Sequence, residues 1–426
     1  LLTIYFITQG VLTMKKTLVA LAAAAAISPA AFAGDVSWGG DANVEGFIGR
    51  QDTNATSGTE TDNRGYTQRV RLKGTFKTDG NVSVNTRLVL DESAWTGDDF
   101  AVNTYSNNSG DGVRVDYSYI QAPIAGWTFR FGRQIANWAN CFLTCDDRRD
   151  RILAMKRFGG TTLILLNDKR ASTSNDETSY TSEGDLYVAA AVGVVKGWQW
   201  GVLVGKWIGE PNYILDEVFA ISPFVKGKAG PVKLEGAINI LGGGEDDYAA
   251  FRDTVFSMYV KAGMEVGAIN LEGQMVYVQE GNLVAPGFDT FSILLSNTPD
   301  NNQTNTNVHS MGGLGKMGLN NALYGVGGGY TEYSEADDEI LFGFRASGKA
   351  GKIGWKAAVT YLALENDRTG FEEKWNMTTL DGGVTYAVAK TTEVYLNAAI
   401  GAKDDETAAN VDVDYQAATV GITTTF

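Results

Sequence analysis

The chain has few of the residues on which most catalytic and metal sites depend. Its 426 residues include one histidine, His309, and two cysteines, Cys141 and Cys145. The histidine lies in a polar, glycine-flanked stretch, which does not indicate a Ser–His or Asp–His catalytic pair. Two thiols without a nearby histidine are too few ligands for a structural zinc site, which takes four. We therefore expect no enzyme and no resident metal or cofactor.

Proline, basic residues and long apolar runs are also scarce. The chain has 7 prolines, which suits a protein in which nearly every strand donates ladder hydrogen bonds. Acidic residues number 50 against 35 basic ones, which argues against a nucleic-acid partner. After residue 33, no stretch approaches the roughly 18 apolar residues of a transmembrane helix.

The N-terminal residues have the features of an export signal. Met14, Lys15 and Lys16 precede an apolar run at 17–27, and Ala31-Phe32-Ala33 is a small-x-small cleavage site. We expect residues 14–33 to be a signal peptide and residues 1–13 to be a mis-assigned start; an extended leader is the alternative. Residues 34–426 would then form the mature protein, one domain with no linker, carrying 33 basic and 50 acidic residues.

Strand-like alternation runs through most of the mature chain. In "YTQRVRLKGTF", residues 66–76, Arg69, Arg71 and Lys73 share one face, while apolar residues occupy the other. The same period of two recurs in about twenty segments, of which 151–158 and 305–317 are weak. Tight glycine turns tend to alternate with long polar loops between them. The pattern predicts an all-β fold: either a soluble sandwich or a transmembrane antiparallel barrel of about 16–20 strands, with 18 favoured.

Aromatic residues decide between these two folds. Trp127, Trp198 and Trp355 each follow the glycine of a tight turn and lie on the apolar face of their strands. Such a row at one rim is typical of the aromatic girdle of a membrane barrel. The chain ends on Phe426, on the apolar face of an alternating segment, a terminal signal for barrel insertion. We therefore expect the basic face of each strand to point into a water-filled lumen.

On these patterns the chain resembles the general diffusion porins of the Gram-negative outer membrane. The stretch most similar to the family is "VDYSYIQAPIAGWTFRFGRQIANW", residues 115–138. The resemblance implies multi-pass insertion in the outer membrane, contact with lipopolysaccharide, assembly by the barrel-insertion machinery and a homotrimer. It also implies passive diffusion of small hydrophilic solutes and ions, without a cofactor. A substrate-specific channel has the same sequence pattern, and a non-conducting adhesin or structural barrel is a third alternative.

The expected filter has a basic wall and a mixed loop. By strand parity the basic wall consists of Arg69, Arg71, Lys73, Arg87, Arg114 and Arg130. In the family the third loop folds into the lumen; here it corresponds to residues 139–150, whose shortness argues against a deep inward fold. The candidate constriction residues are Asp146, Asp147, Arg148, Arg149, Asp150 and Arg151. We expect a weak anion preference, because most of the acidic excess lies in loops, where salt screens it.

Two further features concern the loops. Cys141 and Cys145 would reach an oxidising compartment, which favours a disulfide that staples the loop over free thiols or a metal site. Acidic clusters at 245–247, 337–339 and 404–406 are expected to face outward. They serve either as solvated surface charge or as divalent-cation bridges to lipopolysaccharide.

Overall fold

The computed structural model describes eleven ranges of the chain: 34–53, 60–94, 113–171, 184–209, 216–244, 253–279, 284–285, 287–295, 338–366, 373–406 and 412–426. Within them, no helix is long and apolar enough to cross a membrane. The expected leader, the weak segment at 305–317, His309 and the acidic cluster at 245–247 lie outside these ranges.

Eighteen strands account for almost all of the described residues. They are β1 (Val36–Thr53), β2 (Glu60–Lys77), β3 (Ser83–Ala94), β4 (Arg114–Ile124), β5 (Trp127–Trp138), β6 (Thr144–Phe158), β7 (Thr161–Ala171), β8 (Gly184–Val195), β9 (Trp198–Gly209), β10 (Phe219–Ala229), β11 (Val232–Gly242), β12 (Val255–Val266), β13 (Ile269–Val278), β14 (Asp338–Ala350), β15 (Ile353–Asn366), β16 (Glu373–Ala389), β17 (Thr392–Asp405) and β18 (Val413–Thr425).

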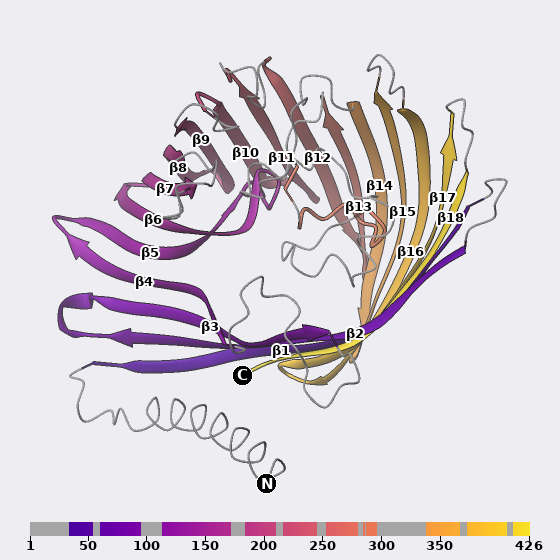
Figure 1. Cartoon of the computed structure of the whole chain (residues 1–426), viewed down its shortest axis with the longest axis horizontal. Coiled ribbons are helices and arrows are strands. Elements are labelled where there is room, and N and C mark those ends of the chain that lie inside the picture. The colour runs from indigo at the N-terminus through magenta and orange to yellow at the C-terminus, as the bar shows by residue number, and fades with distance from the viewer. Residues whose placement is uncertain are drawn as a thin grey trace, which may run out of the picture.

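The strands form one closed antiparallel sheet (Figure 1). Each strand pairs with its neighbours in sequence, and β18 pairs with β1 from Asp41↔Thr425 to Thr53↔Val413. An open sheet would have two edge strands with unpaired backbone N–H and C=O groups. Closure pairs these groups with each other, as a barrel in lipid requires. The prediction of an all-β barrel with 18 strands is confirmed.

Short connections lie on one rim of the barrel. From β4 onward, every even-numbered strand reaches the next strand through two residues, as in Ile124↔Trp127 and Ala350↔Ile353. The weak segment 151–158 is not a separate strand, because it continues β6, which begins at Thr144. Residues 144–150, expected to be loop, therefore belong to a strand as well.

The outer face of the barrel is apolar and open. Large hydrophobic side chains such as Ile48, Val204, Phe344 and Leu396 are about half exposed. The basic residues of the wall lie on the opposite face of their strands. Because a soluble barrel would cover such a surface, this face is the one that contacts lipid.

A β-bulge overturns the predicted parity of β4. Alternation alone places Tyr117 and Tyr119 on the lipid side with Val113 and Val115, which are indeed exposed. The register shifts between Arg87 and Leu88 on β3, so both Asp116 and Tyr117 are buried and Tyr117 lies opposite Arg87. One extra residue in a strand reverses every face after it. The two tyrosines therefore point into the barrel.

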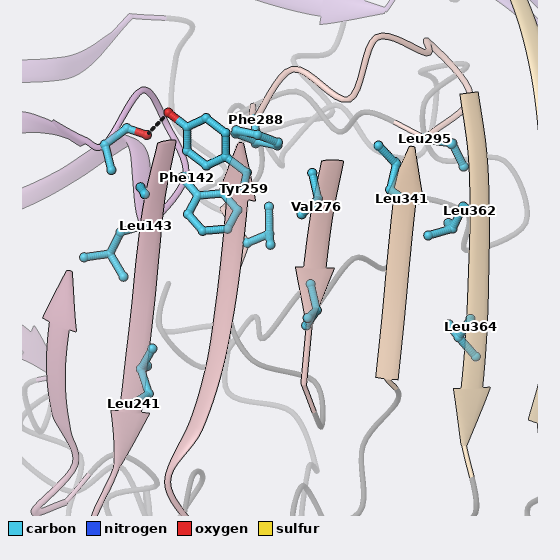
Figure 2. Packing of buried hydrophobic residues seen from close by; sticks show 14 of the residues in the cluster. Phe142, Leu143, Leu241, Tyr259, Val276, Phe288, Leu295, Leu341, Leu362 and Leu364 are labelled. Carbon is cyan, nitrogen blue, oxygen red and sulfur yellow. Dashed lines mark hydrogen bonds between the residues drawn. The ribbon is translucent and has the colours of Figure 1, made fainter. Parts of the chain in front are cut away.

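The lumen contains a hydrophobic core, which a fully water-filled channel would lack. Buried side chains from the inner faces of β8–β16 pack against chain segments inside the barrel. Figure 2 shows part of this packing, with Leu241, Val276, Leu341 and Leu362 projecting from the wall strands. The expectation that the inner wall of the barrel is polar is therefore wrong for these strands.

Candidate pore constriction

A hairpin made of β5 and β6 leaves the wall and enters the lumen. β4 pairs with β5 only as far as Ser118↔Arg133, and β6 pairs with β7 only from Arg151↔Asp168. Between these limits, the β5 residues 134–138 pair only with the β6 residues 144–149. In Figure 1 the tip of the hairpin lies beside β10–β12 rather than beside its neighbours in sequence. The inward fold is thus deep, contrary to what the shortness of the loop indicated.

The tip of the hairpin is a tight turn with backbone in the left-handed region. Ala139, Asn140 and Cys141 have φ of 53°, 56° and 66°. A disulfide joins Cys141 to Cys145, whose Cα atoms are 4.4 Å apart. The bond closes a small covalent ring whose backbone includes Phe142, and the Phe142 side chain is fully buried.

Three wall strands receive the tip through hydrogen bonds. The indole Nε1 of Trp138 donates to the carbonyl of Ser222 on β10 at 3.0 Å. On β11, the Asn239 amide donates to the carbonyl of Phe142 at 3.3 Å. On β12, the Tyr259 hydroxyl donates to the carbonyl of Ala139 at 3.4 Å (Figure 2). These contacts hold the tip against the wall opposite its origin.

A second inward segment, described at residues 284–285 and 287–295, meets the hairpin. The Ala285 amide donates to the carbonyl of Phe142 at 3.0 Å. The rings of Phe142, Tyr259 and Phe288 pack together, with centroids 4.7 to 5.1 Å apart (Figure 2). Contacts of this length between aromatic rings stabilise the packing beyond what the buried apolar area contributes. The two segments thus form one partition inside the barrel.

The far end of this second segment is fixed to the wall strands β13–β16. Asp289 pairs with Arg345 of β14 at 2.7 Å, and its carbonyl accepts from Gln274 of β13 at 2.9 Å. The Ile293 amide donates to the Asp381 carboxylate of β16 at 2.8 Å. Sequence analysis missed this segment because its flanking residues show no strand-like alternation.

The basic wall is paired with carboxylates that the sequence did not single out. Arg71 contacts both carboxylate oxygens of Asp41 on β1, at 2.9 and 3.1 Å. Glu92 on β3 is almost fully buried and pairs with both Arg69 and Arg114. One carboxylate therefore serves two guanidinium groups.

The same sharing occurs where the wall faces the hairpin. Asp116, in the bulge of β4, pairs with Arg87 of the wall and with Arg148 of the hairpin. Arg148 also pairs with Asp146, which lies 3.8 Å from the Arg87 guanidinium. These ion pairs join one face of the hairpin to β3 and β4.

The other face of the hairpin is joined to β7. Asp147 contacts Arg149, Arg151 and Arg170 at 3.2, 2.6 and 3.1 Å. Arg151 and Arg170 also contact Asp168, at 3.3 and 2.9 Å. Asp147, Arg151 and Asp168 are buried, so this cluster is a strong anchor, since opposite charges attract more strongly where water is excluded.

Three predicted residues lie apart from these clusters. Arg130 points into the lumen, where it donates to Gln121 at 2.8 Å and stacks over Tyr119. Lys73 lies on the same face of β2 as Arg71, closer to the short-turn rim. Asp150 lies on the opposite face of β6 from Arg149 and Arg151, and its side chain is 68% exposed beside Arg133, outside the two ion-pair clusters.

The carboxylates Asp41, Glu92, Asp116 and Asp168, and Arg170 with them, are the residues that sequence analysis missed. Asp41 and Glu92 lie on the same faces as their partners, so strand register could have found them. Asp116 could not be found in this way, because the bulge alters the parity. The expected acidic partners, Asp146, Asp147 and Asp150, all lie in the hairpin.

The predicted membrane-facing residues lie at strand ends. Trp127 and Trp198 are the first residues of β5 and β9, directly after two-residue turns, and Trp355 is the third residue of β15. Phe426 is 65% exposed, and its backbone exchanges two hydrogen bonds with Gly40 of β1, at 2.8 and 3.1 Å. The terminal residue thus completes the seam between β18 and β1.

Comparisons with known proteins support the fold. No protein-family model matches the sequence, and no curated protein matches it. The outer membrane protein OpdK of Pseudomonas aeruginosa resembles the structure with a TM-score of 0.56 and 13% identity, over 92% of this chain and 99% of that chain. OpdK with vanillate gives 0.55 and 12% over the same shares. OccAB3 of Acinetobacter baumannii gives 0.55 and 10% over 92% of this chain and 100% of that chain.

These solved structures are outer-membrane porins, which are channels and not enzymes. The closed barrel and its apolar outer face agree with that comparison, and with a lipid bilayer and lipopolysaccharide as surroundings. The chain therefore has the fold of the Gram-negative outer-membrane porins.

Proposed function

We propose that the protein is a substrate-selective outer-membrane channel for small organic anions. The observation that carries this proposal is the partition formed by residues 134–150 and 284–295, joined to each other across the lumen. A partition with fixed side chains restricts solutes by shape as well as by size. For this reason we favour a selective channel over general diffusion.

The ion pairs of the constriction support a preference for anions. Glu92 and Asp116 each contact two guanidinium groups, which carry more positive charge than one carboxylate can neutralise. Among the residues that the structure describes in this part of the wall, the guanidinium groups outnumber the carboxylates, which gives a net positive potential beside the path. In a narrow, partly apolar lumen such a potential raises the local concentration of anions. Transport is passive, down the solute's own gradient.

The likeness to OpdK suggests a first solute to test. That protein has been solved with vanillate, a small aromatic carboxylate. We expect vanillate to cross liposomes containing this protein faster than vanillyl alcohol, which has almost the same size but no carboxylate. Equal rates for the two solutes would favour general diffusion, and no flux of either would favour the non-conducting barrel.

Charge selectivity provides the second test. In planar bilayers with a salt gradient, we expect the reversal potential of the wild type to indicate an anion preference. Replacing Arg69, Arg71 and Arg114 together with glutamine should shift it toward cations. The matched control replaces Lys226, Lys228 and Lys233, which lie toward the short-turn rim, away from the partition. A strongly cation-selective wild type would contradict the proposal.

The oligomeric state is a separate proposal. Each barrel encloses its own partition, so conduction does not require a partner. The homotrimer implied by the porin resemblance would add only contacts between outer faces. Light scattering of the detergent-solubilised protein measures the mass, and three equal closing steps per insertion event would indicate a trimer.

A further inference from the structure

An apolar wall lies behind the hairpin, where a porin lumen would ordinarily be polar. The inner faces of β7, β8 and β9 carry Leu166, Leu186, Val188 and Leu203. Their outer faces are apolar too, as the exposed Tyr187 and Val204 show. A strand that is apolar on both faces is covered on both. Lipid covers one face here, and the hairpin covers the other only in part.

The space left between the hairpin and this wall is a cavity of about 240 Å³. Trp138 and Leu143 of the hairpin line one side, and Ala190, Trp207 and Ala220 of the wall line the other. An apolar cavity of about 150 Å³ in another protein stays dry and binds benzene. The present cavity is large enough for a substituted benzene ring.

Besides Asn137 and Thr144, two further polar features of the cavity define what it can hold. Trp207 is only 4% exposed, yet its indole Nε1 has no hydrogen-bond acceptor within the part of the chain that the structure describes. A buried donor without an acceptor lowers stability until an acceptor reaches it. The charged residues that line the cavity are Asp147, Arg151, Asp168 and Arg170, two of each sign and paired with one another. A net charge on the ligand would therefore find no counter-charge without breaking these pairs.

We propose that this cavity binds a small neutral aromatic molecule that carries one hydrogen-bond acceptor for Trp207. The site is distinct from the arginine-lined path, which favours anions. Its occupant contacts both the hairpin and the wall, so binding also fixes the distance between them. Binding to the folded barrel does not depend on conduction, so failure of this proposal and failure of the proposed channel function are distinguishable.

Acetophenone and isopropylbenzene form a pair of probes of similar size: a methyl group replaces the carbonyl oxygen and a tetrahedral carbon replaces the planar one, so only acetophenone carries a hydrogen-bond acceptor. Isothermal titration calorimetry of the refolded barrel in detergent, with a micelle blank, gives both affinities. We expect acetophenone to bind at one site per chain, about five- to tenfold more tightly than isopropylbenzene, which corresponds to one hydrogen bond. The substitution Trp207→Phe should remove this difference between the two probes and leave the affinity for isopropylbenzene unchanged.

Filling the cavity should abolish binding of both probes. Ala190 lies in the cavity and is 4% exposed, whereas its neighbour Ala189 faces lipid. Ala190→Phe should prevent binding, and Ala189→Phe, with the same added ring on the other face, should not. If Ala190→Phe does not fold, Ala190→Leu is the second variant, expected to weaken binding at least tenfold. Equal titrations of Ala190→Phe and wild type, or no binding to a folded wild type, would overturn the proposal.

Discussion

At the scale of single residues, the most consequential feature is the sharing of carboxylates among arginines. Glu92 is 1% exposed and lies between Arg69 and Arg114, so neither guanidinium has the carboxylate to itself. Such an arrangement fixes two guanidinium groups on one carboxylate, which carries only half of their combined charge. A freely moving arginine would present the same charge to a passing anion, but its guanidinium group would have no fixed position.

The first prediction concerns Glu92→Gln. It removes the one carboxylate between two guanidinium groups, so the anion preference should increase and the barrel should become less stable. Breaking a buried pair costs about 3–5 kcal/mol in general. The reversal potential and the midpoint of urea unfolding measure the two effects. The control is Glu393→Gln on β17, which removes the same charge away from the partition; equal shifts in the two variants would contradict the local explanation.

Glycine is required at one residue of the seam. A Cβ at Gly40 would lie 2.4 Å from the Arg71 carbonyl oxygen and 2.5 Å from the Phe426 ring. Neither the backbone of β2 nor the terminal residue can move without disturbing the pairing of β1 with its neighbours. The close approach therefore depends on the absence of a side chain.

The second prediction follows for Gly40→Val. We expect a lower yield of folded barrel, measured as the fraction that keeps compact mobility in unheated SDS gels. Gly382→Ala on β16 is the control, because a Cβ there meets nothing within 4 Å. If Gly40→Val folds as well as the control, the seam tolerates the displacement of Phe426.

At the scale of elements, the β5–β6 hairpin shows what sequence could and could not predict. The strands follow from alternation, which is local, so eighteen of them were predictable. Docking of Phe142 against Tyr259 joins residues more than a hundred positions apart, which no local pattern encodes. The apolar pair Phe142-Leu143 inside a loop was the available signal that the tip would be buried.

The third prediction concerns the disulfide between Cys141 and Cys145. The Cys141→Ser, Cys145→Ser double variant should stay folded, because the ring is small and stabilises less than the roughly 3 kcal/mol expected from chain entropy for a 15-residue loop. Since Trp138 and Phe142 also hold the tip, we expect noisier open-channel current with a similar mean. Single-channel recording measures this noise. The wild type treated with reductant should show the same noise as the double variant. Identical noise in both proteins would show that the other contacts suffice.

At the scale of the whole molecule, the barrel and its partition have separate sources of stability. The wall is a closed ladder of backbone hydrogen bonds that does not need the lumen to be filled. The partition depends on side-chain packing between residues 134–150 and 284–295, centred on Phe142, Tyr259 and Phe288. A change in the packing can therefore open the channel without unfolding the barrel.

The fourth prediction tests this separation with Phe142→Ala. The side chain is fully buried where the two inward segments meet, and in protein cores Phe→Ala substitutions cost about 3–5 kcal/mol. Because that cost falls on the partition, we expect a larger unit conductance and weaker discrimination between vanillate and vanillyl alcohol, with unchanged heat-modifiable mobility. Phe131→Ala is the control: Phe131 belongs to the same hairpin, on β5, but faces lipid, stacked on Phe129. It should leave conductance as it is. An unchanged conductance in Phe142→Ala would mean that the aromatic contact does not limit the open path.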